Sequence, residues 1–124
     1  MKNVNDRGIY LVVYTGPGQG DRKNDPGYLW LPPGCCKFGQ SLSLSTVEKR
    51  YQDWCSGNAD VILVGHFKDR DDIDTIEKAL HHKFTGRRLK NRNNRLSEWM
   101  QAIPMAELRN AVSEAIQEHF KLWK

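Results

Sequence analysis

The chain has 124 residues, a formal net charge of +4 and three cysteines. This length allows one domain with one modest core and excludes a separate recognition domain beside a catalytic one, so we expect a single domain over residues 1–124. The odd number of cysteines argues against a disulfide framework. The sequence has no apolar run long enough to span a membrane and no hydrophobic segment at its start, so we expect a cytoplasmic protein.

The first third of the chain predicts two strands separated by a long loop. β-branched and aromatic residues from Ile9 to Thr15 indicate a strand that is buried on both faces. The stretch 16–34 is rich in glycine and proline, so it predicts a long inserted loop, of the kind that is functional in small domains. Residues 36–41 predict the second strand.

A helix and a third strand follow. The capping-box pattern at Ser45–Glu48 predicts the start of a helix whose apolar face contains Val47, Tyr51 and Trp54. Residues 60–67 are almost continuously apolar, which predicts a strand at the centre of a sheet.

A second helix carries a carboxylate in an unusual place. Its apolar stripe, at helical spacing, consists of Ile73, Ile76, Leu80 and Phe84. Glu77 falls on this stripe, where a charge is costly unless a partner or a metal ion compensates it. The four aspartates at the start of the helix are expected to act as capping and dipole residues.

The region after this helix is basic. Six cations follow one another without an intervening acid: Lys83, Arg87, Arg88, Lys90, Arg92 and Arg95. With the asparagines between them they predict a flexible loop that binds the phosphates and sugars of a nucleic acid, although a solvated surface remains an alternative. A last helix after Pro104 is expected to complete the core with Met105, Leu108, Val112, Ala115, Ile116 and Trp123.

Several short motifs occur in a fixed order: Gly8-Ile9-Tyr10, Lys37-Phe38-Gly39, Arg50, Glu77–Phe84 and Ser97–Met100. This constellation resembles the GIY-YIG nuclease superfamily, in a branch that is common in phage and mobile-element proteins and ends in a Glu-Trp segment. The resemblance covers nearly the whole chain. It implies an α/β (α+β) fold with a small three-stranded, mainly antiparallel sheet flanked by helices.

The resemblance also implies a divalent-metal-dependent endonuclease that hydrolyses phosphodiester bonds in DNA, with Mg²⁺ (or Mn²⁺) as the cofactor. It assigns the metal to Glu77, the general base to Tyr10 and the phosphate contact to Arg50. Lys37 stands where the family has a tyrosine, and its ammonium would lower the pKa of Tyr10 or hold the attacking water. His81, one turn after Glu77, is a further candidate for the phosphate contact or the acid, with a structural role as its alternative.

Other interpretations remain open at this stage. The chain could be a catalytically inactive nucleic-acid-binding module of the same fold, or a small protein-interaction domain whose basic stretch is only soluble surface. RNA remains open as a substrate, and so does a homodimer. Salt-sensitive binding of nucleic acid separates the third interpretation from the others, and cleavage separates the first two.

Overall fold

A computed structural model describes residues 7–22, 24–67 and 69–121. The main sheet is antiparallel, has five strands and follows the order β5-β1-β4-β7-β6. Its strands are β1 (Gly8–Tyr14), β4 (Cys36–Ser41), β5 (Ala59–His66), β6 (Arg88–Lys90) and β7 (Leu96–Met100), while β2 (Gln19–Gly20) and β3 (Trp30–Leu31) form a separate ribbon. The helices are α1 (Leu44–Trp54), α2 (Arg70–Lys83), the short 3₁₀ helix η1 (Thr85–Arg87) and α3 (Met105–Lys121).

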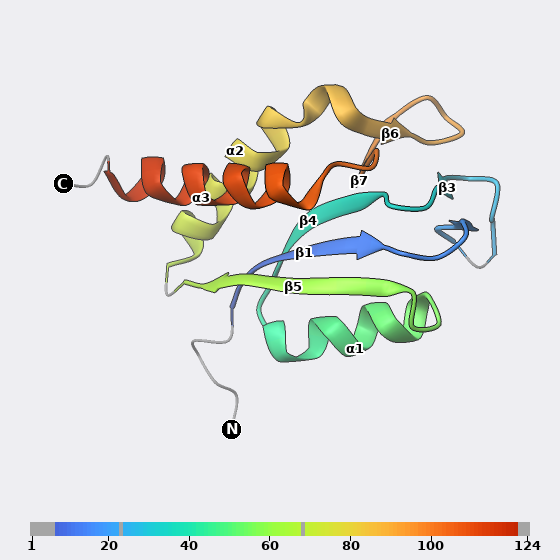
Figure 1. Cartoon of the computed structure of the whole chain (residues 1–124), viewed down its shortest axis with the longest axis horizontal. Coiled ribbons are helices and arrows are strands. Elements are labelled where there is room, and N and C mark those ends of the chain that lie inside the picture. The colour runs from blue at the N-terminus through green and yellow to red at the C-terminus, as the bar shows by residue number, and fades with distance from the viewer. Residues whose placement is uncertain (1–6, 23, 68, 122–124) are drawn as a thin grey trace.

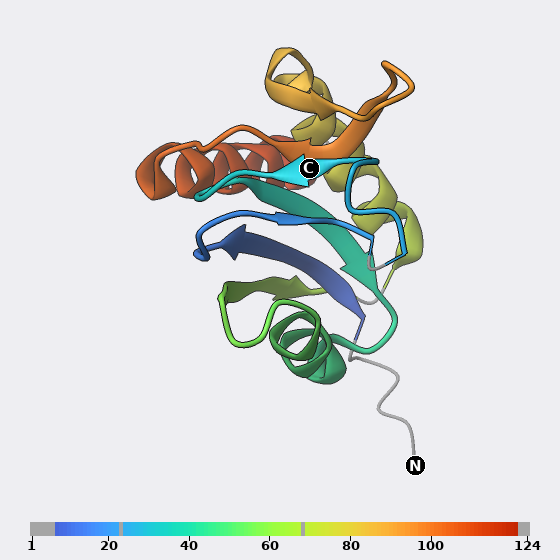
Figure 2. The same ribbon diagram turned by 90° about the vertical axis from the view of Figure 1, so that its right-hand side faces the viewer.

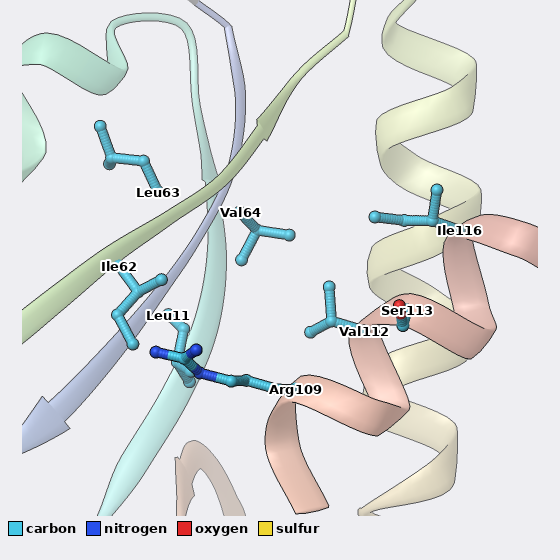
Figure 3. A pocket seen from close by; sticks show the side chains of 8 residues that line it. All are labelled: Leu11, Ile62, Leu63, Val64, Arg109, Val112, Ser113 and Ile116. Carbon is cyan, nitrogen blue, oxygen red and sulfur yellow. The ribbon is translucent and has the colours of Figure 1, made fainter. Parts of the chain in front are cut away.

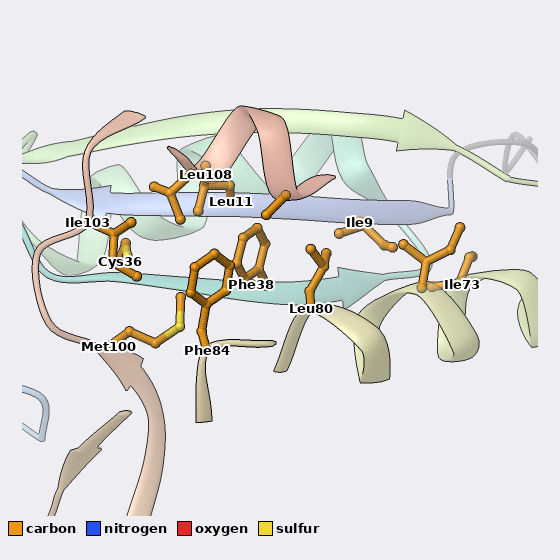
Figure 4. Packing of buried hydrophobic residues seen from close by; sticks show 12 residues of the cluster. Ile9, Leu11, Cys36, Phe38, Ile73, Leu80, Phe84, Met100, Ile103 and Leu108 are labelled. Carbon is orange, nitrogen blue, oxygen red and sulfur yellow. The ribbon is translucent and has the colours of Figure 1, made fainter. Parts of the chain in front are cut away.

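The sheet has a hydrophobic layer on each face. Side chains of β1 alternate between the faces, so Ile9 and Leu11 pack with residues of α2 and α3, whereas Tyr10 and Val12 pack with α1. Figure 1 shows α1 on one side of the sheet and α2 with α3 on the other. Figure 4 shows the first of these layers, where Phe38 of β4 lies between the strands and α2. The prediction that the first strand is buried on both faces is confirmed.

The α+β class and the antiparallel pairing are confirmed, but the expected three-stranded sheet is wrong in its strand number. The two additional strands, β6 and β7, come from the basic stretch and the Glu-Trp segment, for which the sequence predicts a loop and a terminal motif. The charged residues Arg88 and Lys90 hide the strand pattern of β6, because β6 is an edge strand and charged side chains are common on edges.

The third predicted strand forms, but it lies at the edge of the sheet and not at its centre. The strand is apolar because both of its faces pack against helices. Ile62 and Val64 pack on the α2–α3 side, and Ala59 and Val61 pack on the α1 side. Helix α1 also begins earlier than the capping-box pattern predicted, at Leu44, because this fully buried residue anchors its first turn.

The last helix forms as expected, and Leu108 contributes to the core. Trp123, which was assigned to the same apolar face, lies outside the described residues. No helix in the described part of the chain combines the length and the apolar character needed to cross a bilayer.

Candidate functional site

The two signature motifs meet through a tyrosine and a glycine. Tyr10 of β1 lies opposite Gly39 of β4 in the antiparallel register. A Cβ atom placed on Gly39 would lie 2.5 Å from both Cζ and Oη of Tyr10. The tyrosine ring therefore occupies the space above this glycine, and the missing side chain allows the ring to lie across β4.

The hydroxyl of Tyr10 ends in a small polar cluster with two consecutive residues of α1. Its Oη lies 3.1 Å from the Oη of Tyr51, and Nη2 of Arg50 donates to it over 3.5 Å. Burial and the hydrogen bond with Tyr51 raise the pKa of Tyr10 above its ordinary value, and the charge of Arg50 opposes this only in part. Tyr10 is therefore a neutral phenol at neutral pH, contrary to the activated base expected from the sequence.

Lys37 projects to the same face, because it lies opposite Val12 of β1. Its side chain is only 13% exposed, and its Nζ lies 3.1 Å from the Oε2 of Glu98, which is 60% exposed. The same ammonium lies 5.5 Å from the ring centroid of Tyr51 and 5.6 Å from that of Trp99. Burial alone would lower the pKa of Lys37, but Tyr51 and Glu98 outweigh it, so the pKa is raised and the lysine stays charged.

A hollow of about 280 Å³ lies beside this cluster. It is lined by Asp21, Lys37, Arg50, Tyr51, Trp54 and Trp99. A neighbouring hollow of about 370 Å³ shares three of these residues and extends to the β6–β7 hairpin. The Oδ1 atom of Asp21, which borders both hollows, is buried without a hydrogen-bond partner among the described residues, and burial raises the pKa of this carboxyl group.

Glu77 and His81 lie on the other face of the sheet. Gln40 of β4 faces α2, and its Nε2 donates to the Oε2 of Glu77 over 2.7 Å and to the Oδ1 of Asp74 over 2.8 Å. His81 Nε2 lies 3.3 Å from the Oε1 of Glu77, and the side chains of Glu77 and His81 are only 14% and 20% exposed. The structure thus brings Tyr10, Lys37 and Arg50 together, and it places the expected metal ligand on the far side of β4.

Two carboxylates lie close together around Glu77. The described residues contain no group of three or more His, Cys, Asp or Glu side chains that would form a closed metal site. However, carboxylate oxygens of Glu77 and Asp74 converge on one amide nitrogen, and Mg²⁺ is commonly bound by one or two carboxylates together with water and phosphate oxygens. The residues present therefore fit such an ion through Glu77, with water and phosphate completing the shell.

Most of the predicted nucleic-acid-binding cations have partners within the protein. Arg92 forms a two-pronged ion pair with Asp25, at 2.9 and 2.7 Å. Arg87 pairs with Glu107 at 2.9 Å, Lys83 pairs with Glu114 at 3.0 Å, and Arg88 donates to the carbonyl of Ser97 at 2.7 Å. Lys90 and Arg95 are exposed, and neither side chain has an ion pair or hydrogen bond within the described ranges. The stretch is thus less available to phosphates than its composition suggests.

A third hollow, of about 380 Å³, lies between β5 and α3 (Figure 3). Apart from Arg109 and Ser113 its lining is aliphatic, and it contains none of the predicted site residues. It is therefore not a part of the candidate site.

The sequence predicts no role in the site for several residues of the two clusters, among them Tyr51, Asp21 and Gln40. Tyr51 was assigned only to the apolar face of its helix, and Asp21 lies in a stretch without periodicity. Gln40 is a polar residue in a short strand, directly after the second motif. Only for Tyr51 did the sequence contain a signal, because its neighbour Arg50 was already a site residue.

Comparison of the chain with family models, curated proteins and solved structures gives no match in any of the three cases. The geometry around β4 therefore carries the functional argument.

Proposed function

We propose that the chain is a divalent-metal-dependent endonuclease that hydrolyses phosphodiester bonds in DNA. The observation that carries this proposal is that Lys37 and Arg50 line one hollow on the α1 face of the sheet, while the buried Tyr10 places its hydroxyl against Arg50 and Tyr51 at the edge of that hollow. These residues come from three elements that are separated in sequence, and they combine two permanent cations with a phenol. A site of this kind suits a phosphodiester, since hydrolysis builds up negative charge on the phosphate oxygens.

In this proposal the two cations bind the phosphate. The guanidinium of Arg50 presents planar donors to phosphate oxygens, and the shielded ammonium of Lys37 supplies a second charge close to them. The two hydroxyl groups of Tyr10 and Tyr51, 3.1 Å apart, position the attacking water by hydrogen bonds. The raised pKa of Tyr10 favours this positioning role over proton abstraction.

Glu77 would hold the divalent cation, which supplies Lewis-acid stabilisation and a more acidic bound water. His81 and Gln40 fix the orientation of this carboxylate through hydrogen bonds to its two oxygens. The Nδ1 atom of His81 is buried without a partner in the described part of the chain, so the ring is held by its Nε2 contact and by packing.

A second candidate function is a catalytically inactive nucleic-acid-binding module. The placement of Glu77 and Tyr10 on opposite faces of the sheet favours this alternative, because one phosphodiester must reach both groups for the proposed chemistry. Binding alone needs only the cations of the hollow. Cleavage therefore decides between the two functions.

The test is incubation of the purified protein with supercoiled plasmid DNA, in magnesium or in chelator, beside Glu77→Gln and Arg50→Lys. We expect nicking that requires the metal and falls by about 100-fold or more in both variants, as for the loss of one group that stabilises transition-state charge. Glu118→Gln is the matched control, because Glu118 is an exposed carboxylate of α3 that forms no hydrogen bond or ion pair with either cluster in the described part of the chain, so this variant should cleave like the wild type.

Equal cleavage by the wild type and Glu77→Gln would reject the metal assignment. Salt-sensitive DNA binding without metal-dependent cleavage would reject the nuclease and leave the binding module. An intact thermal unfolding transition in each variant excludes misfolding as the cause of lost activity.

A further inference from the structure

The β6–β7 hairpin is an exposed ribbon whose tip lies beyond the body of the sheet. Its strands pair in antiparallel register between Arg88 and Met100 and between Lys90 and Leu96, and residues 91–95 connect them. Figures 1 and 2 show this connection projecting past the sheet, next to the ribbon formed by β2 and β3. Residues 92–96 are exposed.

The backbone of the tip is tightly organised by Asn91. The Oδ1 of this residue accepts from the backbone N–H of Asn93 at 2.9 Å and from that of Arg95 at 3.2 Å. The backbone N–H of Asn91 donates to the carbonyl of Arg95 at 2.9 Å, and the N–H of Asn94 donates to the carbonyl of Asn91 at 2.9 Å. The turn is therefore closed by its own hydrogen bonds.

A second set of contacts fixes the hairpin to the segment before β3. The side chain of Asn91 donates to the hydroxyl of Tyr28 at 2.8 Å, and the backbone N–H of Arg92 donates to the carbonyl of Tyr28 at 2.7 Å. The ion pair between Arg92 and Asp25 closes the same junction. Tyr28 is also covered by Arg22, whose Cζ lies 3.5 Å from the ring centroid. These contacts with Tyr28 and Asp25 fix the orientation of the tip relative to the hollow in the absence of a ligand.

Three side chains at the tip take no part in this network. Asn93, Asn94 and Arg95 are exposed and have no side-chain hydrogen bond or ion pair among residues 7–22, 24–67 and 69–121. Asn94 has a φ of 62°, a left-handed conformation that asparagine tolerates well, so the turn itself explains this residue. Asn93 and Arg95 have no left-handed φ, so the turn does not require an asparagine or an arginine at these two positions.

The chemistry of these two side chains fits the edges of bases. Asparagine can bond to adenine through two hydrogen bonds, and arginine can do the same with guanine. A two-stranded ribbon has the dimensions to enter the major groove of duplex DNA. Asn91 at the tip and Ser97 of β7 line the hollow that also contains Lys37, so the tip would lie beside the bound phosphate.

We propose that the β6–β7 hairpin reads DNA sequence in the major groove, with Asn93 and Arg95 as the base-contacting residues and Arg92 as the residue that orients the tip. This inference rests on the proposed function to the extent that the ligand is duplex DNA. It assigns Arg92 to positioning, because its guanidinium is already bound by Asp25.

The experiment is a binding selection from a randomised DNA duplex library in chelator, followed by sequencing of the bound fraction. The wild type should enrich a short motif. Arg95→Lys keeps the charge but loses the two-pronged geometry, so discrimination at one guanine position should fall by about 10- to 100-fold while affinity for unselected DNA stays within about threefold. Asn93→Ala should relax a neighbouring position. Lys90→Ala is the control on the same hairpin and should weaken binding without changing the motif.

The inference would be overturned if the wild type enriches no motif. It would also be overturned if Arg95→Lys and Asn93→Ala both enrich the same motif as the wild type. Failure of the endonuclease proposal gives a different result, namely a motif that depends on Arg95 in a protein that does not cleave DNA in magnesium. The tip residues are exposed, and a thermal unfolding curve for each variant excludes a folding defect.

Discussion

The contact between Gly39 and Tyr10 predicts that Gly39→Ala destabilises the protein. The new Cβ atom would lie 2.5 Å from Cζ and Oη of Tyr10, whereas carbon atoms pack best at about 3.5–4.0 Å, so the ring must move by about 1 Å. Tyr10 is 4% exposed and has little room for this shift. Overpacking costs about 1–3 kcal/mol, and alanine in place of glycine in a strand regains about 0.5–1 kcal/mol. At the midpoints of these ranges we therefore expect a net loss of about 1 kcal/mol and a Tm lower by about 4 °C.

Urea unfolding followed by the fluorescence of the four tryptophans measures this loss. The same substitution in a Tyr10→Leu background should cost nothing or stabilise the protein, because the ring that causes the clash is gone. Gly86→Ala is the matched control, since no atom lies within 4 Å of its added Cβ and its backbone is not left-handed. Our account of the motif glycine is refuted if Gly39→Ala is as stable as the wild type, or costs the same in both backgrounds.

Three further predictions concern titration and the hairpin. Because the pKa of Tyr10 is raised in the folded state, its contribution to the free energy of unfolding should be constant below about pH 10 and decrease as the pH rises further. In thermal unfolding measurements, Tyr10→Phe should make this decrease smaller. The raised pKa of Asp21 means that its carboxylate opposes folding at neutral pH, so Asp21→Asn should raise the Tm at pH 7 but have little effect near pH 3. Asp25→Ala should speed amide hydrogen exchange in the β6–β7 hairpin while changing global stability by about 1 kcal/mol or less, because its ion pair with Arg92 is partly exposed; unchanged exchange would show that the pair does not fix the hairpin.

The sequence predicted those elements whose pattern is set by burial. Strands β1 and β4 and helix α2 were located within a few residues, because their apolar side chains face packed layers on the sheet. The alternation that places Tyr10 and Lys37 on one face also follows from the strand period, once their register is known. The motifs therefore sufficed to predict that Tyr10, Lys37 and Arg50 lie close together.

The sequence could not predict the features that depend on contacts between distant segments. The basic stretch looked like free positive charge because the acids that neutralise it, such as Asp25 and Glu107, are far along the chain. Glu77 lies on the side of α2 that faces the sheet, as its position on the apolar stripe predicted. The stripe does not determine which face of the sheet α2 covers. That choice is made by the crossover of the chain after β5, which places α2 opposite α1.

The opposite placement of Tyr10 and Glu77 restricts where a scissile phosphate would bind. The ladder between β4 and β7 contains the single register pair Cys36–Met100, and no other described strand pairs with the outer edge of residues 37–41. Tyr10 lies across this strand at Gly39 on one face, while Gln40, the next residue, bonds to Glu77 on the other face. A phosphate bound where this free edge borders the hollow, within reach of Lys37 and Arg50, is the arrangement in which one group could meet ligands from both faces. The endonuclease proposal therefore requires the substrate to follow the outer edge of β4, with the hollow and the β6–β7 hairpin at one end of its path.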